Sequence, residues 1–395
     1  MSVRYHDVLT SVAEELRARL EKVAPEGHAA ETLPKVVLTP TRESAHGDFA
    51  TPVALAAGKA WKRNPLEVAQ ALARDGVARL PDVMQIDAVK PGFVNVRMRP
   101  DFWSAVVGDV LRLGAEYGRS QALASIGPIL VEFVSANPTG PLVVVQGRSS
   151  ALGATLVEMF RFAGATAVAE TYVNDAGAQI DLLADSLYVR YASLLGRQTP
   201  MPENGYAGDY LIEIARRLVD RDGSRWLDAA ESDRRSSLGK FGRDMIVAGQ
   251  RDDLERFRVH FDEWTFESQL HASGAIAEAV DRLRSSGFTY EKDGALWLRS
   301  THFGDDRDRV LVRSDGRPTY LAADAAYHWD KLQRGSRFLL DILGPDHHGY
   351  IRRLEALVAA FGFPGSLEVL LAQHVTFKRG GEAVSMSKRA GDLVT

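Results

Sequence analysis

The sequence lacks cysteine altogether: none occurs among its 395 residues. This absence excludes disulfide bonds, thiol nucleophiles and cysteine-ligated zinc. The sequence also lacks any apolar run of the roughly 18 residues that a membrane-spanning helix needs. Its first residues, MSVRYHDVLTSVAEEL, do not contain the apolar core of a signal peptide. We therefore expect a cytoplasmic protein without a membrane partner.

A strong net charge is absent as well, since 48 basic residues are balanced by 52 acidic ones and the formal net charge is -4. Such a balance gives no general attraction to nucleic acid, yet it allows a local basic groove. Charge therefore neither supports nor excludes an RNA partner. What the sequence does contain is 45% hydrophobic residues, which over this length predicts two or three globular domains.

Residues 129–173 predict a strand, a loop, a helix and a second strand in that order. The run Ile-Leu-Val-Glu-Phe-Val at 129–134 has the composition of a buried strand, and the Asn-Pro and Thr-Gly-Pro sequences after it end the strand. From Arg148 the apolar residues take helical spacing, and residues 167–173 again have strand character. This βαβ order predicts a parallel sheet with ligands bound where strand ends meet helix N-termini. The loop of residues 135–146 is therefore the first candidate site.

Residues 1–100 predict a separate small α+β domain. It contains helices at 5–22 and 64–74, a strand at 33–39 and strands within 85–98.

Residues 101–395 predict an α/β core. A connecting helix at 101–117 leads into this core, and a mostly helical, charged insertion at about residues 195–287 separates two halves of one sheet. The strands expected after the insertion are at 295–299, 310–313, 338–343 and 368–377.

Several stretches are distinctive when they are taken together. They are HGDFA at 46–50, residues 131–142, YVNDAGAQID at 172–181, DGALWLRSTHFGDDRDRV at 293–310, DGRPTYLAADAAYHWDK at 315–331, GPDHHGY at 344–350 and RGGEAVSMSKRAGDLVT at 379–395. In these stretches the chain resembles the arginyl-tRNA synthetase family of class I aminoacyl-tRNA synthetases. The resemblance implies a Rossmann-like parallel sheet with a helical insertion, preceded by a small α+β N-terminal domain. It also implies activation of arginine with ATP and Mg²⁺, transfer to tRNA(Arg), and a monomeric protein.

The resemblance implies an arginine site on the first strand, its loop and a later helix, with the residues Glu132, Ser135, Asn137, Tyr320 and Asp324. Arginine is a long cation, so carboxylates would hold its guanidinium, and amide or hydroxyl groups its α-amino end. Glu132 adds an argument of its own, because a carboxylate in an apolar strand is costly without a partner. A substrate guanidinium would be such a partner. Without the resemblance, Tyr320 and Asp324 are an ordinary pair on one helix face.

The resemblance also implies an ATP site, with the residues Thr139, Gly147, Asp346, His347, His348, Met386, Ser387 and Lys388. Lys388 matches the catalytic lysine that neutralises phosphate charge as the arginine carboxylate attacks and pyrophosphate leaves. Ser385 replaces the lysine that is usual at the first position of this loop, which read alone is a solvated turn. The adjacent His347 and His348 point in different directions, so we expect no metal held by the protein, only Mg²⁺ that arrives with ATP.

The first signature departs from the family, which has His-Val-Gly-His where this chain has Val143, Val144, Val145 and Gln146. In the family the histidines donate to the phosphates of ATP, and the glycine lets adenine approach the backbone. Val143 offers no donor and Val145 places a branched side chain against adenine. Gln146 keeps one donor without a positive charge and is the remaining catalytic candidate here. We therefore expect adenylation that is impaired or altered.

For tRNA, the resemblance implies that the first domain contacts the tRNA elbow, with His46, Asp48 and Phe49 as candidates. The family's C-terminal anticodon-binding domain is expected to be absent, because the chain stops at Thr395. Three functions remain open. They are an arginyl-tRNA synthetase with reduced activity, a paralogue that activates arginine for another acceptor, and a non-catalytic arginine- or tRNA-binding protein.

Overall fold

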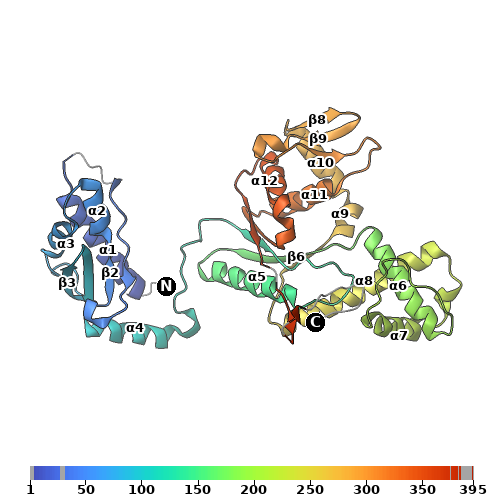
Figure 1. Ribbon diagram of the computed structural model, residues 1–395, viewed down its shortest axis with the longest axis horizontal. Coiled ribbons are helices and arrows are strands. Elements are labelled where there is room, and N and C mark those ends of the chain that lie inside the picture. Colours follow the sequence, from blue (N-terminus) through green and yellow to red (C-terminus); the bar gives the residue numbers. More distant parts are fainter. Residues whose placement is uncertain (1–3, 27–31, 374, 381, 384–393, 395) are drawn as a thin grey trace. The chain divides into compact units, whose positions relative to one another are not determined.

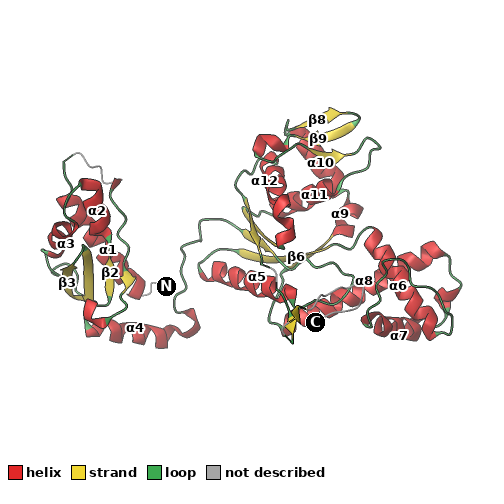
Figure 2. Cartoon of the chain, in the orientation of Figure 1, coloured by secondary structure: helices red, strands yellow, loops and turns green. Residues whose placement is uncertain are grey.

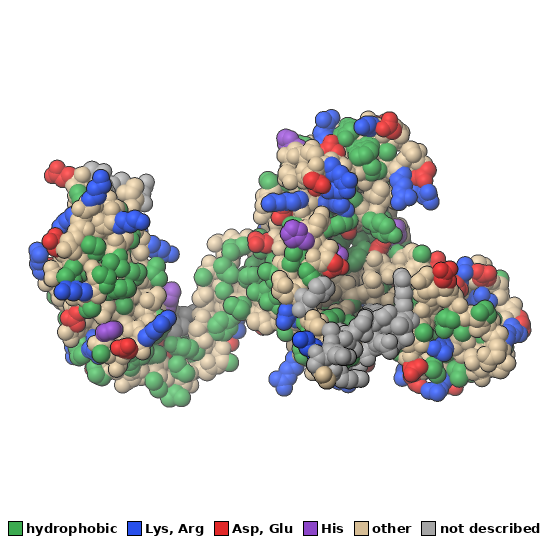
Figure 3. Space-filling model, viewed as in Figure 1, with side chains coloured by type: hydrophobic (Ala, Val, Ile, Leu, Met, Phe, Trp, Pro, Cys, Tyr) green, Lys and Arg blue, Asp and Glu red, His purple; other side chains and the backbone are tan. Residues whose placement is uncertain are grey.

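The computed structural model describes residues 4–26, 32–373, 375–380, 382–383 and 394. The chain divides into two compact units, Met1–Ser120 and Gln121–Thr395, both drawn in Figure 1. Within the described residues, no helix has both the length and the apolar character needed to cross a membrane. On the face drawn in Figure 3, acidic and basic side chains are interspersed over both units.

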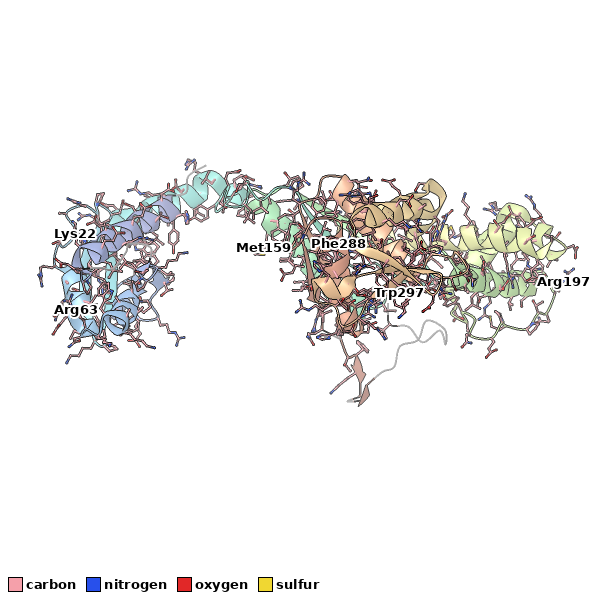
Figure 4. The ribbon with its side chains drawn as sticks, turned by 90° about the horizontal axis from the view of Figure 1, so that it is seen from above. Lys22, Arg63, Met159, Arg197, Phe288 and Trp297 are labelled. Carbon is pink, nitrogen blue, oxygen red and sulfur yellow. The ribbon has the colours of Figure 1, made fainter. Side chains whose placement is uncertain are left out.

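The first unit is an α+β module, as the sequence predicts, with an antiparallel sheet of strand order β1-β2-β4-β3. Its elements are α1 (Arg4–Val23), β1 (Thr39–Pro40), β2 (Phe49–Thr51), α2 (Val53–Trp61), α3 (Pro65–Ala73), β3 (Val83–Val89), β4 (Phe93–Met98) and α4 (Pro100–Leu113). The strand predicted at 33–39 is reduced to β1. Helix α2 has no predicted counterpart, because its sequence VALAAGKAW carries no polar face at helical spacing. Arg63, labelled in Figure 4, ties the turn after α2 to the end of α1 by donating to the carbonyl of Val23 at 3.1 Å.

Helix α4 belongs to the first unit, so the boundary between the two units lies later in the chain than predicted. The sequence pattern predicts a first domain that ends near residue 100, followed by a connecting helix. In the structure, Phe102 and Val106 of α4 are buried in the core of the first unit, together with Phe49 of β2 and Leu16 of α1. The first unit therefore continues to Ser120, because the apolar side of α4 completes its core.

The second unit contains a five-stranded parallel sheet of order β12-β11-β5-β6-β7, which confirms the predicted Rossmann-like core. Strands β10, β9 and β8 form a separate antiparallel sheet, and β13 and β14 form a short hairpin. The elements are β5 (Ile129–Glu132), α5 (Val145–Phe162), β6 (Ala167–Val173), α6 (Ala178–Leu194), α7 (Tyr210–Asp222), α8 (Glu231–Arg256), β7 (Glu263–Phe266), α9 (Glu267–Ser273), α10 (Ala275–Ser285), β8 (Thr289–Lys292), β9 (Ala295–Leu298), β10 (Arg309–Val312), α11 (Tyr320–Gln333), β11 (Phe338–Leu343), α12 (Ile351–Ala360), β12 (Leu367–Leu371), β13 (Lys378–Arg379) and β14 (Glu382–Ala383).

Side chains of the central strands alternate between the two faces of the parallel sheet. Leu130 of β5 and Leu339 of β11 belong to a core that includes α10, α11 and α12. Val131 and Ile342 belong to a second core, which includes Val157 of α5 and the end of α8. Helices therefore cover both faces (Figure 1), and burial on both sides accounts for the nearly continuous apolar composition of β5 and β11.

The helical insertion is shorter than predicted. Helices α6, α7 and α8 pack around a core of their own, which includes Tyr191, Leu211 and Leu238, and Figure 2 draws this part as helices and loops. After α8 the chain returns to the sheet, because β7 pairs in parallel with β6 as the edge strand. The insertion predicted at 195–287 therefore ends before Glu263. The sequence pattern misses β7 because its residues EWTF are too few to show an alternation.

Gly153 of α5 is required by close packing, and its replacement by alanine is expected to lower the free energy of unfolding. A Cβ atom at this position would lie 2.1 Å from Cγ of Phe133, a ring that is fully buried. We expect Gly153→Ala to cost about 1–3 kcal/mol, the usual range for overpacking, measured by urea denaturation. The matched control is Gly249→Ala in α8, where a Cβ meets nothing within 4 Å and a gain of about 0.4–1 kcal/mol is expected. Equal stability of Gly153→Ala and the unaltered protein would contradict this packing.

Candidate active site

The strand order makes the carboxyl ends of β5 and β11 the switch point of the sheet, and we expect a ligand crevice beyond them. The chain leaves β5 for β6 on one side and later adds β11 on the other side of β5. In parallel α/β sheets, ligands bind at such a switch point. Two segments flank the crevice here: the loop of residues 133–144 after β5, and the short 3₁₀ helix η6 (Pro345–Tyr350) after β11.

The loop after β5 begins with two residues in a strained backbone conformation. Val134 has φ of 70° and Ser135 has φ of 39°, in a region that residues with side chains rarely adopt. Hydrogen bonds hold Ser135 there. Its hydroxyl donates to Glu132 Oε1 at 2.7 Å, and Oγ of Ser135 also accepts the Tyr172 N–H at 3.1 Å. The Ser135 N–H donates to the hydroxyl of Thr171 at 3.2 Å. Ser135 therefore fixes both the start of the loop and one oxygen of Glu132.

The carboxylate of Glu132 has a partner within the protein. The ammonium of Lys331 on α11 lies 2.5 Å from Glu132 Oε2 and 2.9 Å from Asp341 Oδ1, and the Lys331 side chain is 0% exposed. Although burial opposes the charged ammonium, the carboxylates of Asp341 and Glu132 raise the pKa of Lys331 above its ordinary value. Glu132 therefore has the partner that a carboxylate in an apolar strand needs, and this partner is a buried lysine of the protein itself. A contact of Glu132 with arginine stays a prediction.

Asp341 and His328 extend this buried network beneath the crevice. Nε2 of His328 lies 3.0 Å from Asp341 Oδ2, and its Nδ1 lies 2.8 Å from the backbone carbonyl of Asp324. Burial by itself would raise the pKa of Asp341. The charges of Lys331 and His328 and their hydrogen bonds hold this pKa well below its ordinary value. The network therefore joins β5, β11 and α11 and fixes the start of α11, where Asp324 lies.

Asp324 differs from Glu132 because its hydrogen-bond donor is neutral. Its Oδ2 accepts a hydrogen bond from the hydroxyl of Tyr350 at 2.9 Å, and among the described residues no cation forms an ion pair with it. Burial raises the pKa of Asp324; the charge of His328 and the hydrogen bond from Tyr350 oppose this shift, and the charges of Glu132 and Glu267 add to it, so the pKa stays above its ordinary value. Burial also raises the pKa of Tyr350 to about 12. An ionised Asp324 therefore leaves its charge available to a ligand.

Tyr320 and Asp324 do not form the pair that their spacing suggests. Tyr320 is 78% exposed, whereas Asp324 points to Tyr350 in the interior. Tyr320 borders a cleft of about 990 Å³ that lies between the loop after β6, helix α9 and the start of α11, with Asn174, Glu267 and His271 among its other lining residues.

Glu267 and Tyr172 belong to this region, although the sequence pattern did not indicate them. Glu267 begins α9 directly after β7, and Tyr172 lies near the end of β6. Burial raises the pKa of Tyr172, and the charge of Glu267 and a hydrogen bond to it raise this pKa further. Both residues lie at the carboxyl ends of parallel strands, where ligands bind. That signal is visible only once β7 is recognised as a strand.

The divergent signature forms the turn into α5. Oε1 of Gln146 accepts the backbone N–H of Val143 at 2.9 Å, so the glutamine side chain is engaged within the turn. Val145 is the first residue of α5. Val144 is partly exposed, and its N–H donates to the carbonyl of Val394 at 2.9 Å.

The other residues predicted on this loop differ in exposure. Asn137 is exposed, whereas Thr139 is buried. Gly147 faces open space, since a Cβ there would meet nothing within 4 Å. The ATP role predicted for Thr139 would therefore fall to its backbone rather than to its side chain.

The remaining predicted ATP residues lie on η6 or outside the described residues. The side chains of Asp346 and His347 on η6 are exposed, with His347 Nε2 3.7 Å from Asp346 Oδ2, and His348 is exposed beside them. In the part of the chain that the structure describes, no group of three or more His, Cys, Asp or Glu side chains is arranged to hold a metal ion. Met386, Ser387 and Lys388 lie outside the described residues.

In the first unit, the residues predicted to contact the tRNA elbow have different environments. Only the side chain of His46 is exposed. Asp48 uses its carboxylate to accept the Met98 N–H at 2.7 Å. Phe49 is 1% exposed and packs against Tyr5, so the prediction needs correction there: a ring in the core has no surface for RNA.

Comparison with known proteins agrees with the geometry. A family model described as the arginyl tRNA synthetase N terminal domain matches residues 10–98. An arginine–tRNA ligase of Solidesulfovibrio magneticus is 45% identical over 366 residues, which are 91% of this chain and 66% of that protein. One of Geobacillus kaustophilus is 41% identical over 98% of this chain and 70% of that protein. The structure of Thermus thermophilus arginyl-tRNA synthetase is similar in fold, with a TM-score of 0.64 and 20% identity over 92% of this chain and 65% of that one.

The chain thus spans about two thirds of the length of the curated relatives that it matches. The identity extends over nearly all of the present chain and includes both units. This chain therefore belongs to the arginyl-tRNA synthetase (arginine–tRNA ligase) family.

Proposed function

We propose that this protein activates arginine with ATP and transfers the arginyl group to tRNA. The arginine carboxylate attacks the α-phosphorus of ATP, the bond to pyrophosphate breaks, and the arginyl group then passes from AMP to a tRNA hydroxyl. The observation that carries the proposal is Asp324, a partly buried carboxylate on α11 whose hydrogen-bond donor is the neutral hydroxyl of Tyr350. A guanidinium beside this carboxylate would supply the missing positive charge.

The proposed arginine contacts divide by chemistry. Asp324 binds the guanidinium while the Tyr350 hydroxyl, 2.9 Å away, holds the carboxylate in place. Glu132 contributes a carboxylate whose charge is shared with Lys331. Asn137, in the loop after β5, and Tyr320, at the start of α11, are the proposed contacts of the other end of the amino acid.

The proposed ATP contacts lie around the start of α5. Helix N-termini favour phosphate, and the open space at Gly147 leaves room for the nucleotide to approach. His347 and His348, on η6 after the neighbouring strand β11, are proposed to supply donors, and Lys388 is proposed to neutralise the leaving pyrophosphate. We propose that Mg²⁺ arrives bound to ATP and neutralises phosphate charge.

We further propose that adenylation is weakened in this protein. The side chain of Val143 has no hydrogen-bond donor, and Oε1 of Gln146 accepts the Val143 N–H, so that within the turn only Nε2 of Gln146 is left to donate. This observation also supports a second candidate, a paralogue that binds arginine or tRNA without forming the adenylate or that serves another acceptor. For both candidate functions, we propose that the protein contacts tRNA through the first unit, near the exposed His46. We also propose that the protein is a monomer.

The test is arginine-dependent conversion of ATP to AMP and pyrophosphate, measured with and without tRNA. Conversion in either condition is expected and supports arginine activation, and attachment of arginine to tRNA then separates the synthetase from a paralogue with another acceptor. Arginine binding without any conversion would favour a non-catalytic binding protein, and the absence of both would contradict both candidates.

The affinity for arginine is expected to fall on acidification, at a higher pH than an ordinary aspartate would give. Because burial raises the pKa of Asp324, the carboxylate takes up a proton at a higher pH than an ordinary aspartate, and the protonated form does not attract the guanidinium. Affinity should therefore be full above this raised pKa and decline as the pH falls through it. Titration calorimetry over a pH series measures the decline, and Asp324→Asn should remove it. An affinity that stays constant down to the ordinary range of aspartate would contradict the assignment.

A further inference from the structure

The helical insertion holds the loop after β5 through direct hydrogen bonds. The hydroxyl of Tyr210, the first residue of α7, donates to the carbonyl of Thr139 at 2.6 Å. Nε2 of Gln250, on α8, donates to the carbonyls of Gly140 at 2.8 Å and Asn137 at 3.4 Å. Two helices that follow the loop in sequence thus contact the backbone of three of its residues.

These contacts meet a need that the loop cannot meet alone. Its sequence Asn-Pro-Thr-Gly-Pro contains two prolines, which have no N–H and do not allow a regular helix or strand. The backbone carbonyls of the loop therefore lack the regular backbone donors and need other hydrogen-bond partners. Gln250 is only 3% exposed, and a buried amide is costly unless it is hydrogen-bonded. The amide of Gln250 therefore provides hydrogen-bond donors for the loop carbonyls, and these carbonyls provide acceptors for the buried amide.

Helix α8 also connects the insertion to the sheet. Leu238, near its start, is buried in the core of the insertion, whereas Leu254, near its end, is buried in the core that contains Val131 of β5. Gln250 lies between these two anchors. The position of α8 is therefore fixed at both ends, which makes it a rigid support for the loop.

We propose that Tyr210 and Gln250 are positioning residues that set the geometry of residues 137–140, so that substrate affinity at this loop depends on the helical insertion. The effect on affinity rests on the proposed function, because Asn137 and Thr139 are the proposed contacts of arginine and ATP. Neither Tyr210 nor Gln250 touches substrate in this proposal. Both act through the backbone carbonyls that they hold.

Tyr210→Phe and Gln250→Glu test this proposal. Tyr210→Phe removes one hydroxyl, and Gln250→Glu places carboxylate oxygens against carbonyls without changing the shape of the side chain. The matched control is Tyr191→Phe, because the Tyr191 hydroxyl donates to the Gly223 carbonyl at the same 2.6 Å but within the insertion. All three variants are compared in the full chain.

The first measurement is hydrogen exchange of the amides of residues 137–147. Exchange is expected to accelerate in Tyr210→Phe and Gln250→Glu and to stay unchanged there in Tyr191→Phe. In Gln250→Glu the acceleration should diminish at acidic pH, because a protonated carboxyl again donates to a carbonyl. Unchanged loop exchange in both variants would overturn the proposal.

The second measurement is arginine affinity by calorimetry. The loss of one neutral hydrogen bond predicts affinity that is about 2- to 10-fold weaker in Tyr210→Phe, with none of this loss in Tyr191→Phe. Equal affinity in Tyr210→Phe and the unaltered protein would overturn the link to substrate. If the unaltered protein binds no arginine, the proposed function fails, while the exchange experiment still decides whether the insertion positions the loop.

Discussion

Replacing Val143 with histidine, Val145 with glycine and Gln146 with histidine is expected to raise arginine-dependent pyrophosphate release by about 10²–10³-fold. The removal of one preorganised donor to a developing charge costs about that factor, and the three changes restore two donors. The geometry supports this expectation, because Val143 and Gln146 lie together in the turn, joined by the hydrogen bond between the Val143 N–H and Gln146 Oε1. Glycine at position 145 would also remove the branched side chain at the first residue of α5.

The control for the restored signature is Val144→His. This substitution adds a histidine to the same turn at a position that is partly exposed, and no gain in rate is expected from it. Pyrophosphate release should be followed with and without tRNA for all variants. A restored signature that is no faster than the unaltered protein would contradict the explanation of weak adenylation by the missing donors.

Replacing Lys331 with methionine is expected to lower the free energy of unfolding by about 3–5 kcal/mol, the usual loss when one partner of a buried ion pair is removed. Methionine keeps most of the volume of the side chain, but it leaves Glu132 and Asp341 without the ammonium that lies 2.5 and 2.9 Å from them. Arginine affinity should fall as well, because the oxygen of Glu132 that Lys331 holds would be free to turn.

The loss in Lys331→Met should depend on pH in a defined direction. In the unaltered protein the pKa of Asp341 is held well below its ordinary value, so its ion pairing stabilises the fold above the pKa of an unfolded aspartate and is lost as the pH falls toward the folded pKa. The variant lacks this stabilisation, so the difference between the two proteins should shrink in acid.

Urea denaturation at neutral and acidic pH measures this difference. The control is Arg235→Met, which removes partly exposed ion pairs with Asp185 and Glu231 and should cost about 0–1 kcal/mol. A loss in Lys331→Met as small as in Arg235→Met would contradict the importance of the buried network.

The fold could be predicted where local pattern and burial agree. The apolar runs of β5, β6 and β11 are buried on both faces, so composition alone identifies them. Strand β7 could not be found in this way, because its four residues take their place from pairing with β6 rather than from their own pattern. The same holds for α4, whose apolar residues gave no indication of which unit they would join.

For the candidate site, the sequence predicts a switch point but not the charge balance around it. The βαβ order predicts a site after β5, and the strand order has the switch point of the sheet at β5 and β11. Lys331 and Glu132, however, are 199 positions apart in sequence, and no local pattern pairs them. Phe49 shows a different limit: the motif around it matches the family, yet its ring serves the core of the first unit.

The central claim is that the protein binds arginine through Asp324. Titration of arginine into the unaltered protein and into Asp324→Ala tests this claim most directly. The control is Asp330→Ala, which lies on the same helix and pairs instead with Arg334 at the surface. We predict saturable binding to the unaltered protein and to Asp330→Ala, and no detectable binding to Asp324→Ala. Unchanged arginine affinity in Asp324→Ala would contradict the assignment of this crevice as the arginine site.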